Sequence, residues 1–302
     1  MRGLLLVAVG LAGCKKDSGL VDDYVSDPIL PYDQLEWVDP FIATGGIGAM
    51  TTGLSPGACA PFGMTLVGPD TRHHVGGAPD FYHFGGYHYD DDRIDGFSHT
   101  HSHGMGVNDY GGLLVMARDG WDPAYTTDPG RTAPFSHDTE WASPGRYAVD
   151  LLDQDIHVEI VATERGAHHV YDFSTGAEPV VLIDLGHALS DSITIDEASL
   201  EVDLAAGEIS GMQRLSGAYS GRYGGALHHF VARIDPLPVA VGAWSDPDSP
   251  QSDVSACSGS TCGAWVELPA GTTEVHVRLA MSYVDVDGAR ANLEAELSLI
   301  HI

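Results

Sequence analysis

The chain of 302 residues has almost no lysine, which occurs only at Lys15 and Lys16. Lysine and arginine together number 14, against 43 aspartates and glutamates, so the net charge is −29. A surface with this charge repels nucleic acid and anionic lipid headgroups, and we therefore expect no nucleic-acid partner. The charge suits divalent cations, neutral ligands or a salty medium, although a need for solubility also explains it.

The N-terminal apolar run, Gly3–Leu11, is too short to cross a bilayer. It leads into Leu-Ala-Gly-Cys14, which resembles a bacterial lipoprotein signal. We predict a signal peptide at 1–14 with lipidated Cys14, then a polar tether at 15–34; an ordinary signal peptide is the alternative. The mature chain would be extracytoplasmic, in the bacterial periplasm or at the outer membrane, and would touch the membrane through its lipid anchor only.

Cysteine is also scarce, with four residues in the whole chain. Cys257 and Cys262 flank a loop of small residues, and in an oxidising compartment they can form a local disulfide. A metal pair is the rival interpretation, but no second pair of cysteines or histidines lies nearby in the sequence. The apolar neighbours of Cys59 predict a buried, unreactive thiol.

Helical periodicity is nearly absent, and only Asp287–Glu296 has it. Glycine is abundant instead, with 37 residues, as is typical of proteins with many tight turns. Alternating apolar and polar residues predict strands, and so does one continuous apolar run; these are Ile156–Ile160, Val275–Leu279, a hairpin over 200–212, and Val180–Ile183. We predict one all-β domain at 35–296, an antiparallel β-sandwich with few short helices.

Two glycine-rich segments precede the main polar stretch. The loop at 38–48 could cradle a ligand with backbone N–H groups, but it lacks the lysine and helix of a nucleotide loop, and a plain turn is the simpler interpretation. After the irregular segment 55–64 come Asp70 and Arg72, which could pair with each other or bind sugar hydroxyls. No serine nucleophile elbow occurs in a suitable context.

The stretch Gly85–Gly104 is the richest in functional groups, with His88, three adjacent aspartates at 90–92, and histidines at 99, 101 and 103. On a strand, His99, His101 and His103 would share one face, where they could bind zinc or, more commonly, hydrogen-bond a polar ligand. The aspartates could bind calcium or form a solvated turn, and they lack the spacing of an EF-hand. The metal ligands are left as unknown.

Ten segments, in this order, resemble the N-terminal domain of glycoside hydrolase family 92, the calcium-dependent exo-α-mannosidases. Together they span most of Trp37–Glu296, so the resemblance is specific although each segment alone is weak. The segments are 38–46, 56–64, 69–72, 85–89, 96–101, 135–140, 142–147, 162–165, 184–187 and 288–293.

The resemblance implies a large β-sandwich, a supersandwich of the galactose-mutarotase kind, packed on a C-terminal (α/α)6 catalytic barrel. The family inverts anomeric configuration and uses calcium, and its acid, base and most metal ligands belong to the barrel, so we expect no catalytic residue here. By motif position, the residues expected to bind mannose-containing glycans are Phe41, Thr44, Gly45, Gly46, Asp70, Arg72, His88, His99 and His101. Ala43 and the segment 102–104 depart from the family pattern, which puts the linkage preference in doubt.

Three functions fit these observations. The first is the N-terminal part of an extracytoplasmic α-mannosidase, inactive without its missing C-terminal catalytic domain. The second is a stand-alone carbohydrate-binding lipoprotein without catalysis. The third is a metal hydrolase built on His99, His101 and His103. Residues 297–302 match the translation of a sequencing adapter, and we therefore expect a non-native tail after Glu296.

Overall fold

The computed structural model describes residues 35, 37–46, 53–71, 83–104 and 106–298. The chain forms two units, Met1–Trp37 and Val38–Ile302, and the architecture below is that of the second. Leu35 and Trp37 are exposed. The predicted signal peptide, Cys14, the tether and Arg72 lie outside the described residues. Within them, no helix is both long and apolar enough to span a bilayer.

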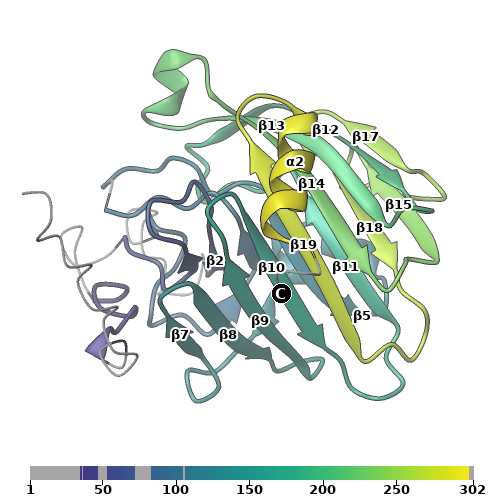
Figure 1. Cartoon of the computed structure of the whole chain (residues 1–302), viewed down its shortest axis with the longest axis horizontal. Coiled ribbons are helices and arrows are strands. Elements are labelled where there is room, and N and C mark those ends of the chain that lie inside the picture. Colours follow the sequence, from purple (N-terminus) through teal and green to yellow (C-terminus); the bar gives the residue numbers. More distant parts are fainter. Residues whose placement is uncertain (1–34, 36, 47–52, 72–82, 105, 299–302) are drawn as a thin grey trace, which may run out of the picture. The chain divides into compact units, whose positions relative to one another are not determined.

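Two antiparallel sheets dominate the second unit (Figure 1). The eight-stranded sheet has the order β1 (Ala58–Cys59), β2 (Leu66–Asp70), β4 (Gly96–Ser98), β5 (Leu114–Asp119), β11 (Pro179–Asp184), β18 (Gly263–Glu267), β15 (Ala240–Trp244) and β16 (Gln251–Ser252). The nine-stranded sheet has the order β17 (Ala256–Ser258), β12 (Thr194–Asp203), β13 (Glu208–Ser216), β14 (Ala226–Asp235), β19 (Glu274–Ser282), β10 (Gly166–Asp172), β9 (Ile156–Ala162), β8 (Arg146–Leu151) and β7 (Trp141–Ser143).

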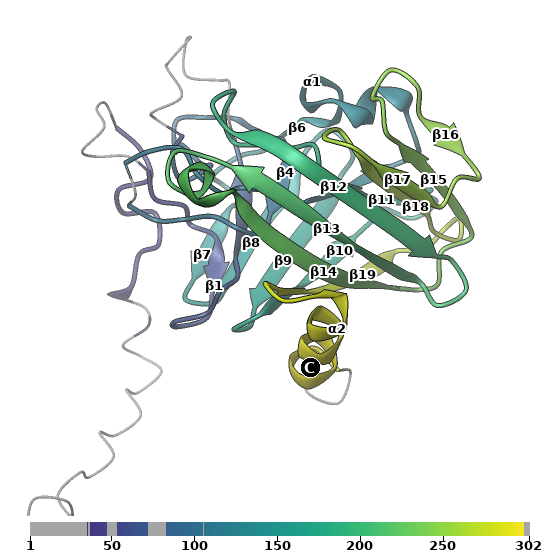
Figure 2. The ribbon, with the colours of Figure 1, turned by 90° about the horizontal axis from the view of Figure 1, so that it is seen from above.

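The two sheets stack as layers around one apolar core (Figure 2). Alternation along each strand supplies the core: in β9, residues 156, 158 and 160 are buried, while 157, 159 and 161 are not. The Phe97 ring on β4 lies 6.3 Å from the Tyr147 ring on β8, so the sheets meet directly. Each fully buried side chain of this size stabilises the fold by about 1.5–3 kcal/mol.

A short layer of loops and turns covers the outer face of the eight-stranded sheet. It contains η3 (Pro123–Thr126), α1 (Asp128–Arg131) and a small ribbon of β3 (Arg93–Ile94) and β6 (Ala133–Pro134). Trp121 begins this layer and stacks on Trp265 of β18 at 3.7 Å, nearly parallel. Glycine is required at position 242, because a Cβ there would lie 2.0 Å from the Trp265 ring. The layer holds α1 against the sheet, and α1 carries a buried arginine described below.

Helix α2 (Val286–Glu296) packs on the outside of the nine-stranded sheet. Asp285 caps its N-terminus by accepting a hydrogen bond from the Gly288 amide at 2.6 Å. Ala289, Leu293 and Leu297 bury against Val231 of β14 and Ala280 of β19. Leu297, the first residue of the segment 297–302 that we expected to be a tail, therefore packs against the sheet.

The predicted all-β sandwich with few short helices is confirmed, as are its individual strands. The runs at 156–160, 275–279 and 180–183 lie in β9, β19 and β11, and the hairpin at 200–212 joins β12 to β13. The helix predicted at 287–296 is α2. Cys257 and Cys262 form the expected disulfide, and Cys59 is a half-buried thiol whose pKa is raised by burial.

Candidate functional site

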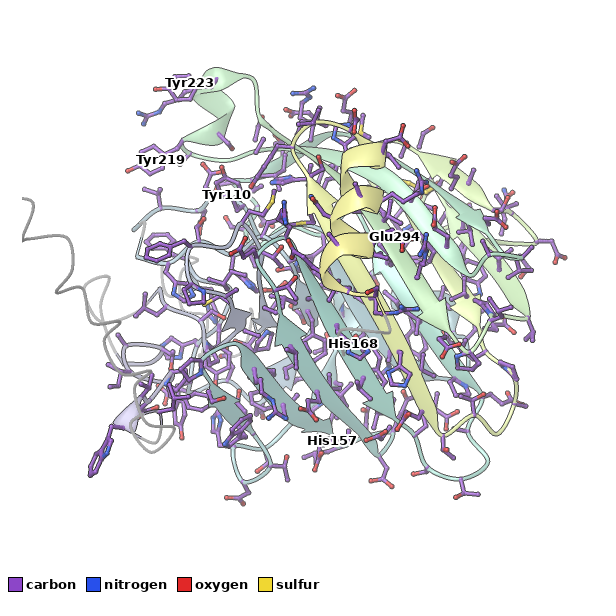
Figure 3. All side chains as sticks on the ribbon, viewed as in Figure 1. Tyr110, His157, His168, Tyr219, Tyr223 and Glu294 are labelled. Atoms are coloured by element: carbon purple, nitrogen blue, oxygen red, sulfur yellow. A yellow bond between two sulfur atoms is a disulfide. The ribbon has the colours of Figure 1, made fainter. Side chains whose placement is uncertain are left out.

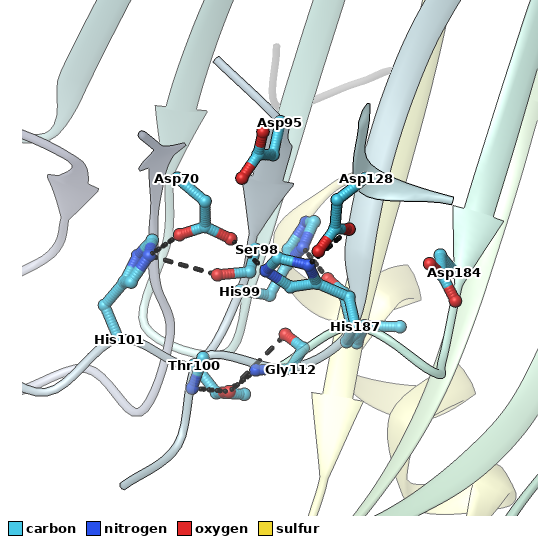
Figure 4. Close-up of polar contacts among 12 residues, drawn as sticks. Asp70, Asp95, Ser98, His99, Thr100, His101, Gly112, Asp128, Asp184 and His187 are labelled. Carbon is cyan, nitrogen blue, oxygen red and sulfur yellow. Dashed lines mark hydrogen bonds and ion pairs between the residues drawn. The ribbon is translucent and has the colours of Figure 1, made fainter. Parts of the chain in front are cut away.

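A buried ion pair between Asp70 and two histidines forms the centre of the candidate site (Figure 4). Asp70 ends strand β2, and its side chain is fully buried. Its Oδ1 lies 2.5 Å from Nε2 of His101, and its Oδ2 lies 2.8 Å from Nε2 of His187. The hydroxyl of Ser98, which ends β4, lies 3.0 Å from the same nitrogen of His101.

The carboxyl group of Asp70 remains ionised despite its burial. Burial alone would raise its pKa, but the charges and hydrogen bonds of His101 and His187 outweigh this and hold the pKa well below its usual range. Both oxygens have an imidazole partner, which is the condition for keeping a charge inside a protein. Because both oxygens are occupied, Asp70 is suited to orienting its neighbours rather than to transferring protons to a ligand.

The ionic contacts extend from His187 into the loop layer. Nδ1 of His187 lies 3.5 Å from Oδ1 of Asp128. Arg131, at the end of α1, contacts the same carboxylate, and its Nη1 donates to Oδ2 of Asp184 at 2.7 Å. Its Nε donates to the backbone carbonyl of Asp95 at 3.2 Å. The Arg131 guanidinium therefore lies between the carboxylates of Asp128 and Asp184 and gives both of them a buried counter-charge.

The segment 85–89 lies directly on the Asp70–His101 pair. Gly86 has φ of +87°, and a Cβ there would lie 2.6 Å from Nε2 of His101 and 2.7 Å from Oδ1 of Asp70. The amide of Thr71 donates to the Gly86 carbonyl at 2.8 Å, and the amide of His88 donates to the Thr71 hydroxyl at 2.9 Å. Only glycine allows the backbone to approach the ion pair this closely.

The glycine-rich loop near residue 44 packs against the same segment. The amide of Tyr89 donates to the Thr44 carbonyl at 2.9 Å, and Nε2 of His88 lies 3.1 Å from the Gly46 carbonyl. The Tyr89 ring meets Phe41 edge-on at 5.9 Å. Through these contacts the structure gathers most of the residues that we expected to bind sugar: Phe41, Thr44, Gly45, Gly46, Asp70, His88 and His101. Four of them, Thr44, Asp70, His88 and His101, are buried and support the site from beneath, whereas Phe41, Gly45 and Gly46 keep exposed surface.

A buried carboxylate braces Tyr89 from the other side. Glu140 accepts hydrogen bonds from the hydroxyls of Tyr87 at 3.0 Å and Tyr147 at 2.7 Å, and it lies 2.6 Å from Nδ1 of His137. The His137 ring stacks on Tyr89 at 4.0 Å, nearly parallel. Burial and the charge of Glu140 raise the pKa values of Tyr87 and Tyr147, so both hydroxyls remain donors. Tyr89 keeps 41% of its surface exposed on this rigid support.

His99 belongs to the core between the sheets and not to the surface of the site. It is fully buried, and its Nε2 lies 3.0 Å from Nε2 of His169 on β10, while its Nδ1 lies 2.9 Å from the Leu113 carbonyl. Burial lowers the pKa of His99 to about 4 and also lowers that of His169, so both imidazoles are neutral near pH 7. We expected His99 to lie close to the ligand, and its burial leaves it no exposed atom for this role.

The interpretation that His99, His101 and His103 share one face is wrong. The strand ends at Ser98, so the alternation of a strand does not continue to residue 103. His99 contacts His169, His101 contacts Asp70, and His103 is exposed. Among the residues that the structure describes, no group of three His, Cys, Asp or Glu side chains is arranged to hold a metal ion.

The described residues do not fit calcium either. Calcium takes six to eight oxygen ligands, whereas the oxygens of Asp70 face two imidazoles and those of Asp184 face Arg131 and the Gly186 amide. In the triple-aspartate segment, Asp91 is buried and lies 2.7 Å from Nε2 of His83, while its two neighbours are exposed. We therefore derive no step through calcium from these residues.

A cavity of about 280 Å³ opens beside the ionic network. Asp128, Asp184 and His187 contribute to both, and Trp244 adds an apolar wall. Of the residues that we expected to bind sugar, the eight that the structure describes do not line it. No role was predicted for Asp128, Arg131, Asp184 and His187. Asp184 and His187 are the first and last residues of one of the ten matched segments, which was the available signal.

Comparison with known proteins identifies the family. The model of the glycosyl hydrolase family 92 N-terminal domain matches residues 37–282. The chain belongs to this family. The predicted resemblance is therefore confirmed, and the sandwich with its buried ion pair is the structure of a family 92 N-terminal domain.

The similar proteins include solved structures and a protein that is described as secreted. A family 92 α-mannosidase from Bacteroides thetaiotaomicron, solved in complex with mannoimidazole, is 26% identical, with a TM-score of 0.74 over 86% of this chain and 34% of that one. A family 92 glycosyl hydrolase structure named ccman5 is 28% identical, with a TM-score of 0.70 over 87% and 34%. An uncharacterized secreted glycosidase from Arthroderma benhamiae is 26% identical over 298 residues.

The chain spans about a third of the length of these relatives. In each of the three relatives, about a third of the length aligns with 86–88% of this chain. The activity, substrates and partners that belong to the full-length relatives are therefore treated below as proposals for this chain.

Proposed function

We propose that this chain is the N-terminal carbohydrate-binding part of an extracytoplasmic, inverting α-mannosidase that trims mannose from glycans. The observation that supports this best is the gathering of the loop at 41–46 and the segment 85–89 over the Asp70–His101 pair. These elements come from distant parts of the chain and present backbone groups, an imidazole and an aromatic ring. That combination suits a neutral, hydroxyl-rich ligand.

In this proposal the described residues bind and orient the sugar and do not cleave it. Inversion requires a carboxylic acid that protonates the leaving oxygen and a carboxylate base that activates water on the opposite face of the ring. Asp70 and Glu140 are each enclosed by their own partners, so neither is poised for these steps. The acid, the base and the calcium ligands would belong to a C-terminal catalytic domain, and this chain would be inactive without it.

The proposed location is outside the cytoplasm. The curated relative from Arthroderma benhamiae is described as secreted, and the Cys257–Cys262 disulfide suits an oxidising compartment. The lipid anchor on Cys14 rests on the sequence pattern alone. Mass spectrometry of the membrane fraction would test it, because lipidation adds acyl chains to the N-terminal cysteine and Cys14→Ser would abolish them.

The binding role is tested by calorimetry with methyl α-mannoside. We expect measurable heat from the wild-type chain and at least about fivefold weaker binding by Tyr89→Ala, since exposed, rigidly held aromatic rings are common energetic anchors. Leu152→Ala is the matched control, because Leu152 is similarly exposed, at 50%, in the turn between β8 and β9. No heat from the wild type, or equal loss in both variants, would contradict the proposal.

The division of labour is tested by hydrolysis of 4-nitrophenyl α-mannoside. We expect no release of nitrophenol by this chain, with or without added calcium, because the catalytic acid and base lie elsewhere. Turnover by the chain alone would show that the proposal places the catalytic residues wrongly. Reading the genomic DNA beyond the codon for Glu296 gives an independent check, since the proposal requires an all-helical domain with acid and base carboxylates downstream.

A further inference from the structure

The hairpin between β13 and β14 ends in two exposed tyrosines (Figure 3). Its tip contains η4 (Ser220–Tyr223). Tyr223 is 88% exposed and Tyr219 is 46% exposed, whereas glycines and serines make up most of the rest of the tip. Figure 3 shows Tyr223, Tyr219 and Tyr110 one after another along the same side of the domain. Exposed rings on a loop are unfavourable in water unless something covers them.

A single buried carboxylate fixes the backbone of this tip. Asp109 is 1% exposed, and its Oδ2 accepts hydrogen bonds from the amides of Tyr219 and Ser220, each at 2.7 Å. Its Oδ1 accepts from the Ser220 hydroxyl at 2.6 Å and from the Tyr110 amide at 3.0 Å. Gly217 permits this approach, since a Cβ there would lie 2.5 Å from Oδ1 of Asp109. The tip is therefore held in place before any ligand arrives.

The same carboxylate holds Tyr110 in an unusual conformation. Tyr110 has φ of +65°, a left-handed value that costs a non-glycine residue free energy. Its ring contacts His228 at 5.9 Å, and His228 in turn contacts Tyr283 at 5.1 Å. Tyr283 is 49% exposed, so aromatic side chains continue from the tip along this side. Strain of this kind persists at binding sites, where it serves to place a side chain.

A short chain of contacts joins the tip to the proposed sugar pocket. The amides of Gly111 and Gly112 donate to the Thr100 hydroxyl at 3.1 and 2.9 Å, and the Gly111 amide also contacts the Thr100 carbonyl at 3.1 Å. Thr100 is followed by His101, the partner of Asp70. The segment 108–112 thus connects the tyrosine tip through hydrogen bonds to Thr100, the chain neighbour of His101.

The chemistry of the tip favours a neutral glycan over a protein partner. A stable protein interface buries at least about 1,000 Å², with an apolar centre. Two tyrosines separated by Ser220, Gly221 and Arg222 offer far less apolar area than this, and the Arg222 guanidinium lies 5.4 Å from the centre of the Tyr219 ring, over one of its faces. A tyrosine ring offers an apolar face to the C–H groups of a sugar and a hydroxyl at its edge, and it loses little entropy on binding. The net charge of −29 disfavours acidic ligands.

We propose that Tyr219 and Tyr223 form an aromatic platform, led by the more exposed Tyr223, that binds a sugar unit of a neutral mannose-containing glycan beyond the terminal mannose. This inference rests on the proposed function and deepens it, because it assigns residues that contact the glycan beyond the terminal sugar. The platform discriminates oligosaccharides from monosaccharides and leaves binding of a single mannose unit unchanged.

The test compares α-mannotriose with methyl α-mannoside in calorimetric titrations of the full chain. Tyr223→Ala and Tyr219→Ala should each weaken α-mannotriose binding at least about fivefold and leave methyl α-mannoside binding within twofold of wild type. Tyr223→Phe should retain most of the affinity, since the ring remains. Phe62→Ala removes a fully exposed aromatic side chain from the turn after β1, and it should change neither ligand.

The outcomes separate the platform from the proposed function. If the wild type binds both ligands and the two alanine variants bind α-mannotriose normally, the platform is wrong while the sugar pocket stands. If the variants lose both ligands equally, the tip supports the pocket structurally and the platform is again wrong. If the wild type binds neither ligand, the platform and the proposed function fail together. If the two alanine variants bind both glycans normally but no longer associate with a catalytic domain, the tip is a protein interface and the inference is wrong.

Discussion

His99 and His101 are two residues apart, both are buried, and their surroundings are opposite in kind. His99 lies between the sheets against His169, where no carboxylate hydrogen-bonds either ring in the described part of the chain. His101 lies against the ionised carboxylate of Asp70, with Ser98 as a further partner. The same side chain thus serves as a neutral core residue at one position and as part of an ionic network at the other.

The difference shows that burial alone does not decide the charge of a group. Burial lowers the pKa of His99 to about 4, and the hydrogen bond to the Leu113 carbonyl and the charge of Asp70 offset this only in part. Burial also acts on Asp70, yet His101 and His187 hold the pKa of that carboxyl well below its usual range. The ionic side of the pair carries the proposed pocket, and the neutral side joins the two sheets beneath it.

The largest effect is expected from removing the charge on the ionic side. Asp70→Asn keeps the volume but deprives His101 and His187 of their buried counter-charge. Breaking one partner of a buried ion pair typically costs about 3–5 kcal/mol, and we expect this loss in the free energy of unfolding. Urea denaturation followed by circular dichroism measures it.

The control for this variant is Asp90→Asn, which removes a carboxylate that is 64% exposed, in the segment 85–104. It should leave the urea midpoint nearly unchanged, since exposed ion pairs contribute little. If both variants unfold at the wild-type midpoint, the Asp70 network does not stabilise the fold, and the contrast between the two histidines loses its energetic meaning.

The buried position of His99 could not be predicted from the sequence, because it depends on the residue at which one strand ends. The alternation at 156–160 predicted β9 correctly, because buried and unburied residues alternate along this strand with a period of two. The position of His99 depends on where β4 stops, which is Ser98, and the sequence Phe-Ser-His-Thr-His carries no signal for that boundary. A shift of one residue in this boundary changes which surroundings each imidazole meets.

The network around Asp70 and His101 was predicted only in part, and the cause differs from that for His99. Asp70 and His101 were identified as site residues because they lie in matched segments, but the contact of Asp70 with His187 joins positions 117 residues apart. The Arg131–Asp184 pair likewise joins positions 53 residues apart. Contacts of this range are set by the strand order β2-β4-β5-β11, and periodicity within a segment contains no information about that order.

Acidification separates the two histidine environments. The folded state binds the proton of His99 only near pH 4, whereas the unfolded chain binds it near pH 6.5. Between these values the unfolded state holds more protons, so the free energy of unfolding decreases as the pH falls, by up to about 3 kcal/mol from this residue. The contribution of Asp70 has the same sign, because folding lowers the pKa of this carboxyl too, but it is lost only below about pH 4, where the unfolded chain binds a proton.

Urea midpoints measured from pH 7 to pH 3 check this separation. In His99→Gln the decrease between pH 6.5 and pH 4 should be shallower than in wild type, although buried His169 continues to contribute in the same direction. His157→Gln replaces a histidine that is 46% exposed and should keep the wild-type slope. A wild-type midpoint that stays constant from pH 6.5 to pH 4 would contradict the neutral burial of His99.

We expect the smallest effect in this series from substituting Gly86, whose backbone lies against the Asp70–His101 pair. Gly86 and Gly104 flank the stretch and both have positive φ, +87° and +66°, so alanine strains the backbone at either position. At Gly104 no atom lies within 4 Å of the new Cβ, whereas at Gly86 the Cβ meets His101 and Asp70. We expect Gly86→Ala to lower the free energy of unfolding by about 1–3 kcal/mol more than Gly104→Ala, because only the first pushes the ion pair apart. Thermal unfolding of the two variants under identical conditions measures the difference. Equal losses would mean that strain alone accounts for both glycines, and that the Asp70–His101 pair tolerates displacement of the segment lying on it.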